Sequence, residues 1–313
     1  MEVIVAEGAL PSPARTRERE RGTLRIGAVQ HRWLPDPEEL RAELRDGAHA
    51  AAAAGACLVC LAELTLTRYF AVTPGGPAAA GAEPEDIATG PTRTFAAELA
   101  AETGAHVHAS LFELAPDGGD ERGYNTAIVV APDGRLVSRT RKLHIPRTAG
   151  YHEDLYFHPG PPEDDVFPVA SIGGAQFGFP TCWDQWFPEL ARAYALGGAD
   201  ILVYPTAIGS EPDHPGFDTE PLWERVITAN GIVNGLFMVA VNRVGEEPPL
   251  TFYGSSFISD PYGRILVSAP RDAPAVIVAD LDLDQRRDWL DLFPLLNTRR
   301  PDVYDPLSRS TIS

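Results

Sequence analysis

One cysteine of the sequence lies where a nucleophile could be placed. Cys182 follows a short β-compatible run (residues 175–179) and precedes a helix expected over residues 188–196. A cysteine on a strand-to-helix turn can project its sulfur out of the backbone, with nearby N–H groups facing a developing anion. Most cysteines are simply buried, so position alone makes Cys182 only a candidate nucleophile.

Three charged residues could complete the chemistry of this thiol. Glu63 closes an apolar run, Lys142 follows an expected edge strand, and Glu153 lies in an aromatic-rich loop. A carboxylate can accept a thiol proton and return it to a leaving amine, and a fixed ammonium can stabilise an oxyanion. A second carboxylate can keep the lysine charged and position water. Each residue alone is as compatible with an ordinary strand end, surface or loop, but together with Cys182 they predict hydrolysis of an amide-like C–N bond.

Composition limits the classes of partner. The chain has 313 residues, 44% of them hydrophobic and 22% charged, as in ordinary globular proteins. A net charge of −18 argues against nucleic acid, and no apolar run approaches the roughly 20 residues of a membrane helix. Cys57 and Cys60 lie in an apolar run expected to be a strand, and the histidines offer no zinc-finger spacing. We therefore expect no nucleic acid, no membrane and no metal.

The first residues lack the order of a signal peptide. A proline and a mixed charge run, residues 15–21, stand where an apolar segment and a cleavage site would be needed. We expect residues 1–22 to form a mobile N-terminal extension, residues 23–313 to form a single domain, and the protein to be cytoplasmic.

Hydrophobic patterning predicts an order that occurs twice, in which strands and helices alternate as β-α-β-α and are followed by consecutive strands. The expected elements of the first round are strands and helices over residues 23–30, 37–54, 57–61, 92–103, 106–112, 126–130 and 136–138. Those of the second round cover residues 175–179, 188–196, 201–204, 221–234, 236–241, 255–258 and 265–267.

Two pairs of segments support an internal repeat. GACLVCLAE at 55–63 resembles GADILVYPT at 198–206, and IVVAPDGRLVS at 128–138 resembles FISDPYGRILVS at 257–268. The repeat predicts an α/β fold of two similar halves, packed as two sheets with helices outside. Sites in open α/β sheets gather at the carboxyl ends of strands, and Glu63, Cys182 and Thr206 all follow such ends.

Seven short motifs stand out along the chain: AEL, RKLHIP, GYHEDLYFHPG, CWDQWFPE, YPTAIGSEP, FYGSSFISDPYG and RRPDVY, at residues 62–64, 141–146, 150–160, 182–189, 204–212, 252–263 and 299–304. In these motifs the chain, from about residue 23 onward, resembles the carbon–nitrogen hydrolase (nitrilase) superfamily, and within it the N-carbamoylputrescine amidase branch.

The resemblance implies roles for the four residues. The glutamate base of the family falls on Glu63, its lysine on Lys142, its nucleophile on Cys182, and the additional glutamate of carbamoyl-hydrolysing members on Glu153. It also implies a four-layer αββα sandwich, a homodimer or higher homo-oligomer, and chemistry without a metal or organic cofactor. The expected reaction is hydrolysis of a terminal ureido group on an alkylamine to the amine, carbon dioxide and ammonia, through a thioester on the cysteine.

The residues expected to contact the substrate are Tyr69, Trp183, Asp184, Trp186 and Thr206. Aromatic walls with a carboxylate at the far end would suit a protonated amine. For one of the two tryptophans, packing beneath the neighbouring helix is the simpler expectation.

The sequence also departs from the family pattern. Ala62 stands where proline is usual, Thr65 where an aromatic residue is common, and Thr181 where an aliphatic residue is usual. Ala62 and Thr65 are expected to line the approach to the base, which leaves other substrates open. The alternatives are a β-ureidopropionase-like enzyme or an aliphatic amidase. A ureido acid would need an arginine in the pocket, for which Arg147, Arg225 and Arg243 are candidates. A non-catalytic binding protein on this fold is a further alternative, although the four intact residues argue against it.

Overall fold

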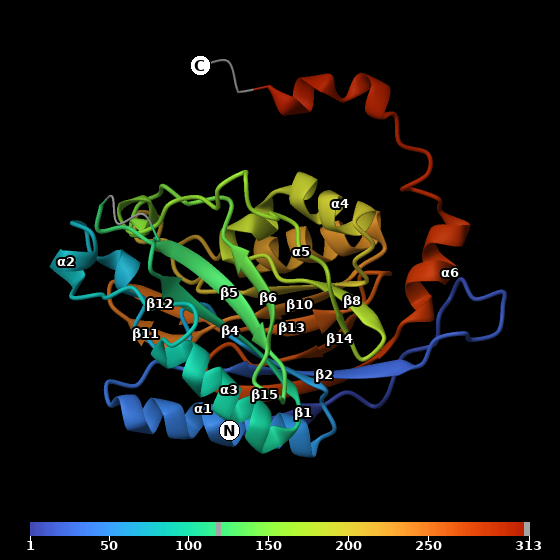
Figure 1. Ribbon diagram of the computed structural model, residues 1–313. Coiled ribbons are helices and arrows are strands. Elements are labelled where there is room, and N and C mark those ends of the chain that lie inside the picture. The colour runs from blue at the N-terminus through green and yellow to red at the C-terminus, as the bar shows by residue number, and fades with distance from the viewer. Residues whose placement is uncertain (117–119, 310–313) are drawn as a thin grey trace.

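The computed structural model describes residues 1–116 and 120–309. Within these ranges the strands form two large sheets and a separate hairpin. Helices cover the outer face of each sheet, so the layers follow the order helix, sheet, sheet, helix (Figure 1). The expected αββα sandwich is confirmed.

The first sheet combines strands from both ends of the chain. Its spatial order is β1 (Glu2–Val5), β15 (Ala275–Asp282), β2 (Thr23–Gln30), β3 (Leu58–Leu61), β4 (His106–Glu113), β5 (Tyr124–Val130) and β6 (Leu136–Arg141). Strands β2, β3 and β4 are parallel, and β5 and β6 continue the sheet in antiparallel fashion.

The second sheet repeats this plan. Its spatial order is β14 (Ile265–Ser268), β13 (Phe257–Ser259), β10 (Phe237–Val241), β9 (Ile201–Pro205), β8 (Ala175–Gly178) and β7 (Ala170–Ile172). Strands β8, β9 and β10 are parallel, and β13 and β14 are antiparallel. Because the same directions recur in the same chain order, the prediction of two similar halves is confirmed. The hairpin of β11 (Val244–Glu247) and β12 (Leu250–Tyr253), inserted between β10 and β13, was not expected.

The predicted helices form close to their expected bounds. The α-helices are α1 (Pro37–Ala53), α2 (Pro77–Ala80), α3 (Pro91–Thr103), α4 (Pro188–Leu196), α5 (Glu220–Asn234) and α6 (Asp284–Leu292). Short 3₁₀ helices cover Phe70–Val72, Glu153–Leu155, Cys182–Trp186, Pro301–Val303 and Asp305–Ser308. Helix α1 begins where it does because the Asp36 carboxylate accepts the Glu38 N–H at 2.8 Å. Helix α3 ends at Gly104, whose φ of 71° is readily adopted by glycine.

Alternating side chains of the sheets form the cores. Between the sheets, Ile26 and Leu58 pack with Phe177, Val203 and Val239, all fully buried. Burial of each such side chain contributes roughly 1.5–3 kcal/mol. The outer faces pack on α1 and α3 and on α4 and α5, which form separate apolar clusters (Figure 1). Apolar packing therefore holds α1 and α3 to one sheet and α4 and α5 to the other.

The N-terminal segment differs from the expected mobile extension outside the domain. Strand β1 pairs in parallel with β15 along Glu2 to Val5. Farther along, the Arg15 guanidinium lies 2.8 Å from the Asp288 carboxylate, and that of Arg21 lies 2.7 Å from Asp200. The charge run of this segment meets acidic partners from the second half of the chain, and no local pattern could show that pairing.

No helix in the described residues is both long and apolar enough to cross a bilayer.

Candidate active site

The four candidate catalytic residues come from loops that follow strands. Glu63 follows β3, Lys142 follows β6 directly, Cys182 follows β8, and Glu153 opens a 3₁₀ helix in the long loop after β6. The side chains of Glu63 and Lys142 are fully buried, and Glu153 and Cys182 are nearly so. The fold thus brings ionisable groups from both sheets into one interior region.

The Lys142 ammonium lies between two carboxylates. It donates to Glu63 Oε1 at 2.9 Å and to Glu153 Oε1 and Oε2 at 2.9 and 2.7 Å. Burial alone would lower the pKa of Lys142, but the charges of Glu153 and Glu63 outweigh it, so the pKa is raised and the lysine stays charged. Burial raises the pKa of Glu153, while Lys142 opposes that rise.

The two oxygens of Glu63 have different surroundings. Oε1 accepts from Lys142 and, at 2.7 Å, from the side-chain amide of Asn125. Oε2 is buried and has no hydrogen-bond partner among the described residues. Because Oε2 makes no hydrogen bond, its lone pairs are free to accept a proton from an incoming group. Leaving a buried acceptor without a partner costs free energy of folding.

Cys182 begins the 3₁₀ helix Cys182–Trp186 with a φ of 38°, in the left-handed region that few side chains adopt. Burial raises the pKa of its thiol well above the usual value, and the Glu63 charge raises it further, whereas Lys142 lowers it. The thiol is therefore protonated near neutral pH and needs a base at the moment of attack. The N–H of Trp183 lies in the first turn of the helix, where backbone donors lack helical partners.

The nucleophile turn is tied to the loop that carries Lys142. The Asp184 carboxylate accepts from the Thr181 N–H at 3.2 Å, the His144 N–H at 2.9 Å and the His144 ring Nδ1 at 2.7 Å. The His144 ring stacks on Phe187 with centroids 3.6 Å apart. Asp184 is thus bonded within the protein and is not among the residues that line the cavity, which favours a structural role over the expected contact with the substrate.

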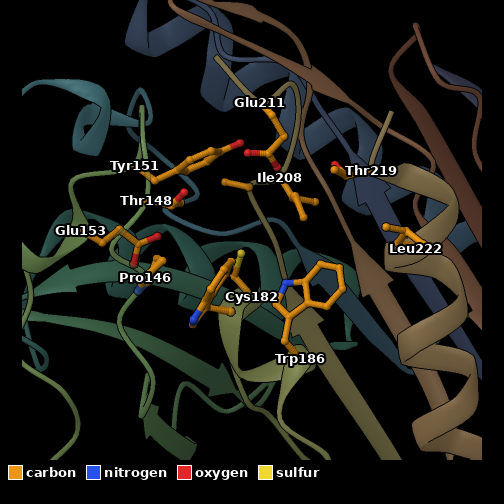
Figure 2. A pocket seen from close by; sticks show the side chains of 12 residues that line it. Pro146, Thr148, Tyr151, Glu153, Cys182, Trp186, Ile208, Glu211, Thr219 and Leu222 are labelled. Atoms are coloured by element: carbon orange, nitrogen blue, oxygen red, sulfur yellow. The ribbon is translucent and has the colours of Figure 1, made fainter. Parts of the chain in front are cut away.

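A cavity of about 240 Å³ opens above Cys182 and Glu153. Figure 2 shows the side chains around it, with the sulfur of Cys182 directed into the space. The lining residues are Pro146, Thr148, Tyr151, Glu153, Cys182, Trp183, Trp186, Ala207, Ile208, Glu211, Thr219 and Leu222. Both tryptophans therefore face the cavity, including the one expected only to pack.

The polar end of the cavity holds Glu211 and Tyr151, which the sequence analysis did not select. Figure 2 shows the Glu211 carboxylate directed toward the Tyr151 hydroxyl, with the Cys182 sulfur lower in the view. Burial raises the pKa of Glu211. Of the described residues that line the cavity, none is a lysine or arginine. The only sign of Glu211 in the sequence was its place within the quoted run YPTAIGSEP.

The remaining predicted residues are buried and form hydrogen bonds with neighbouring groups of the protein. Tyr69 donates its hydroxyl to Glu153 Oε1 at 2.7 Å, and the Thr206 hydroxyl bonds the Tyr204 carbonyl at 3.2 Å. Thr65 bonds the Ala62 carbonyl at 2.9 Å, within its own turn. These four residues are fully buried and are not among those that line the cavity, so contact of Tyr69 and Thr206 with the substrate stays a prediction.

The arginines considered for a substrate carboxylate also lie elsewhere. Arg147 is exposed and pairs with Asp154 at 3.1 Å, Arg225 is exposed on α5, and Arg243 is buried against the backbone near Glu63. The described residues also contain no group of three or more His, Cys, Asp or Glu side chains placed to hold a metal ion.

Comparisons with known proteins agree with this geometry. The family model of carbon-nitrogen hydrolases matches residues 25–291. An N-carbamoylputrescine amidase from Arabidopsis thaliana is 41% identical over 225 residues, which are 69% of this chain and 73% of the relative.

Solved structures show the same fold. A carbon-nitrogen hydrolase from Helicobacter pylori matches with a TM-score of 0.80 at 31% identity, over 93% of this chain and 100% of that one. A mutant amidase from Nesterenkonia sp. matches with a TM-score of 0.69 at 26% identity, over 91% of this chain and 99% of that one. Its structure shows the result of Michael addition of acrylamide at the active site cysteine.

The buried Glu–Lys–Glu cluster, the cysteine at the cavity and the match over most of the sequence agree. The chain belongs to the carbon–nitrogen hydrolase family and is a hydrolase of the amidase type.

Proposed function

We propose that this enzyme hydrolyses the terminal ureido group of an N-carbamoyl alkylamine, such as N-carbamoylputrescine, to the diamine, carbon dioxide and ammonia. The arrangement of Lys142 between Glu63 and Glu153, beside a cavity that contains Cys182, supports the chemistry. The position of Glu211 at the polar end of that cavity supports the substrate class.

In the first half-reaction Cys182 attacks the ureido carbonyl carbon. Oε2 of Glu63 takes the thiol proton as the C–S bond forms, which overcomes the raised pKa of the thiol. The Lys142 ammonium and the N–H of Trp183 stabilise the negative oxygen of the tetrahedral intermediate. As the C–N bond to the terminal nitrogen breaks, Glu63 returns the proton and ammonia leaves.

In the second half-reaction water cleaves the carbamoyl thioester. Glu63, again a carboxylate, takes a proton from the water as its oxygen bonds the carbonyl carbon. Collapse of the second tetrahedral intermediate breaks the C–S bond, and Cys182 recovers the proton. The released carbamate loses carbon dioxide without help and gives the free amine.

Glu153 acts on this cycle through Lys142. Its two oxygens accept from the ammonium, and Tyr69 holds one of them at 2.7 Å. Because Glu153 also reaches the cavity, it can orient the attacking water. We assign it to keeping the lysine charged and placed, and to positioning water, rather than to activating the thiol.

The other end of the substrate is selected by charge. Ile208 and the two tryptophans give the alkyl chain an apolar wall, and Glu211 offers a carboxylate for the protonated amine. A ureido acid would instead place its carboxylate near Glu211 without a cationic partner, which is costly in a partly dehydrated site.

A substrate panel tests this proposal. Ammonia release should show kcat/KM for N-carbamoylputrescine at least about 100-fold above that for N-carbamoyl-β-alanine, roughly 2.7 kcal/mol in transition-state binding. Cys182→Ala should abolish release from both. Equal or better turnover of the ureido acid would favour a β-ureidopropionase-like enzyme, and preference for simple amides would favour an aliphatic amidase.

The role of Glu211 has its own test. Glu211→Gln should lower kcat/KM for the ureido amine by about 30-fold, close to 2 kcal/mol, because a hydrogen bond to a charged group is lost. The same change should leave short uncharged amides nearly unaffected. Glu224→Gln, on α5 and outside the cavity lining, is the matched control. An equal loss for charged and uncharged substrates would argue against amine recognition.

We also propose that the protein assembles with copies of itself. Val303 and Leu307 are exposed on the C-terminal segment, which runs away from the body of the molecule beyond α6 (Figure 1). Apolar side chains on a projecting segment are typical of a contact with another chain.

A further inference from the structure

The turn between Glu63 and Tyr69 supports both catalytic carboxylates. Glu63 stands at its start, and Tyr69, at its end, donates to Glu153 Oε1. The turn has no regular structure, and Leu64 has a φ of 49°, a left-handed conformation that is unfavourable for leucine. Such a backbone persists only where the surrounding structure holds it.

One guanidinium holds most of this turn. Arg243 Nε donates to the Glu63 carbonyl at 3.2 Å, and Nη2 donates to the Leu64 carbonyl at 2.7 Å and to the Thr67 carbonyl. Arg243 lies between β10 and β11, so it connects the second half of the chain to a turn of the first sheet. Its side chain is fully buried.

The charge of Arg243 is balanced by Glu247. Nη1 of Arg243 donates to Glu247 Oε1 at 2.5 Å, and the other carboxylate oxygen accepts the Tyr69 N–H at 2.6 Å. The pair therefore fixes the backbone at both ends of the turn. One end carries Glu63, and the other carries the phenol that bonds Glu153.

We propose that Arg243 is a positioning residue for the general base, a role that rests on the proposed function of Glu63. By binding the carbonyl groups of Glu63, Leu64 and Thr67, it fixes the backbone of Glu63 and with it the position of the Glu63 carboxylate. Its donors are used by the protein, so it is not a ligand for a substrate carboxylate.

The geometry requires arginine rather than any cation. A planar fork donates in several directions at once, whereas a lysine ammonium is a compact point charge. Arg243→Lys keeps the charge and loses the fork. We expect kcat to fall by about 30-fold while KM changes by less than about threefold, since misplacing a catalytic group raises the barrier more than it weakens binding.

A second measurement separates positioning from general damage. Glu63 raises the pKa of the Cys182 thiol, so displacing its carboxylate should lower the apparent pKa seen in iodoacetamide alkylation. Alkylation needs no substrate, so it reports on Arg243 even if the ureido amine proves to be the wrong substrate. Arg264→Lys is the matched control, because Arg264 also pairs with a buried carboxylate four residues away.

Glu247→Gln covers the case in which Arg243→Lys does not fold. This variant keeps the Arg243 guanidinium and weakens its ion pair with residue 247. We therefore expect a smaller fall in kcat and a downward shift of the alkylation pKa. The double variant should be less than additive. The proposal is overturned if KM rises while kcat holds, or if neither kcat nor the alkylation pKa moves in a folded variant.

Discussion

At the scale of residues, one ammonium serves two carboxylates. Lys142 keeps both Glu63 and Glu153 in place and carries the charge that an oxyanion needs. Glu63 opposes the thiolate and Lys142 favours it, so these two neighbours act on Cys182 with opposite signs.

Removing Glu63 and removing Lys142 should therefore shift the pKa of the Cys182 thiol in opposite directions. Glu63→Gln removes a negative charge and should lower the alkylation pKa of Cys182, whereas Lys142→Met should raise it further. Both variants should lose turnover, the lysine variant by roughly 3–4 kcal/mol or more, as for a missing oxyanion donor. The pH dependence of iodoacetamide alkylation checks the signs, and shifts in the same direction would contradict the arrangement.

At the scale of elements, Asp184 joins two loops that come from different sheets. The loop after β6 places Lys142, and the turn after β8 places Cys182. Asp184 accepts backbone N–H groups from both. The relative position of the nucleophile and the ammonium thus depends on one buried carboxylate.

Asp184→Asn should weaken this joint without touching the substrate. The amide offers one acceptor oxygen where the carboxylate offered two, so we expect a stability loss of about 1–3 kcal/mol. We also expect kcat to fall by about tenfold with little change in KM, because the geometry loosens. Urea unfolding and steady-state kinetics measure these effects, with exposed Asp46→Asn on α1 as the control. A rise in KM without a change in kcat would instead favour direct contact between Asp184 and the substrate.

Element patterns predicted most of the sandwich but missed two polar residues of the cavity. Hydrophobic periodicity located the elements that run from β2 to β6 and from β8 to β14, and their ends located Glu63, Lys142 and Cys182. The hairpin of β11 and β12 is short and interrupted by prolines, so its pattern was weak. Tyr151 and Glu211 reach the cavity from irregular loops, whose course depends on packing far away in the sequence.

At the scale of the whole molecule, two buried histidines should make stability depend on pH. Burial lowers the pKa of His31 and His108 to about 3. The unfolded chain binds protons below about pH 6.5. Above about pH 6.5 these histidines therefore do not reduce the free energy of unfolding. Between about pH 6.5 and pH 3 each should reduce it by about 1.4 kcal/mol for every pH unit that the pH falls. Urea unfolding between pH 4.5 and 7 should show a shallower slope in His108→Leu than in wild type, with half-exposed His49→Gln as the control.

Self-association can be tested at the projecting segment. Val303→Asp with Leu307→Asp places charge on exposed apolar side chains, so it should lower the molar mass measured by light scattering while leaving the monomer folded. Leu114→Asp, which adds charge at an exposed leucine elsewhere, should leave the mass unchanged. An unchanged molar mass in the double variant would show that Val303 and Leu307 do not form the contact between chains.

The position of β15 has a consequence for synthesis on the ribosome. In the finished sheet it lies between β1 and β2, pairing Val276 with both Val3 and Val29. Until residues 275–282 leave the exit tunnel, the nascent chain has an open strand edge on β2 and a β1 segment without a partner. Open edges of this kind promote aggregation. The first half of the chain, although made early, can complete its sheet only after residues 275–282 have been translated.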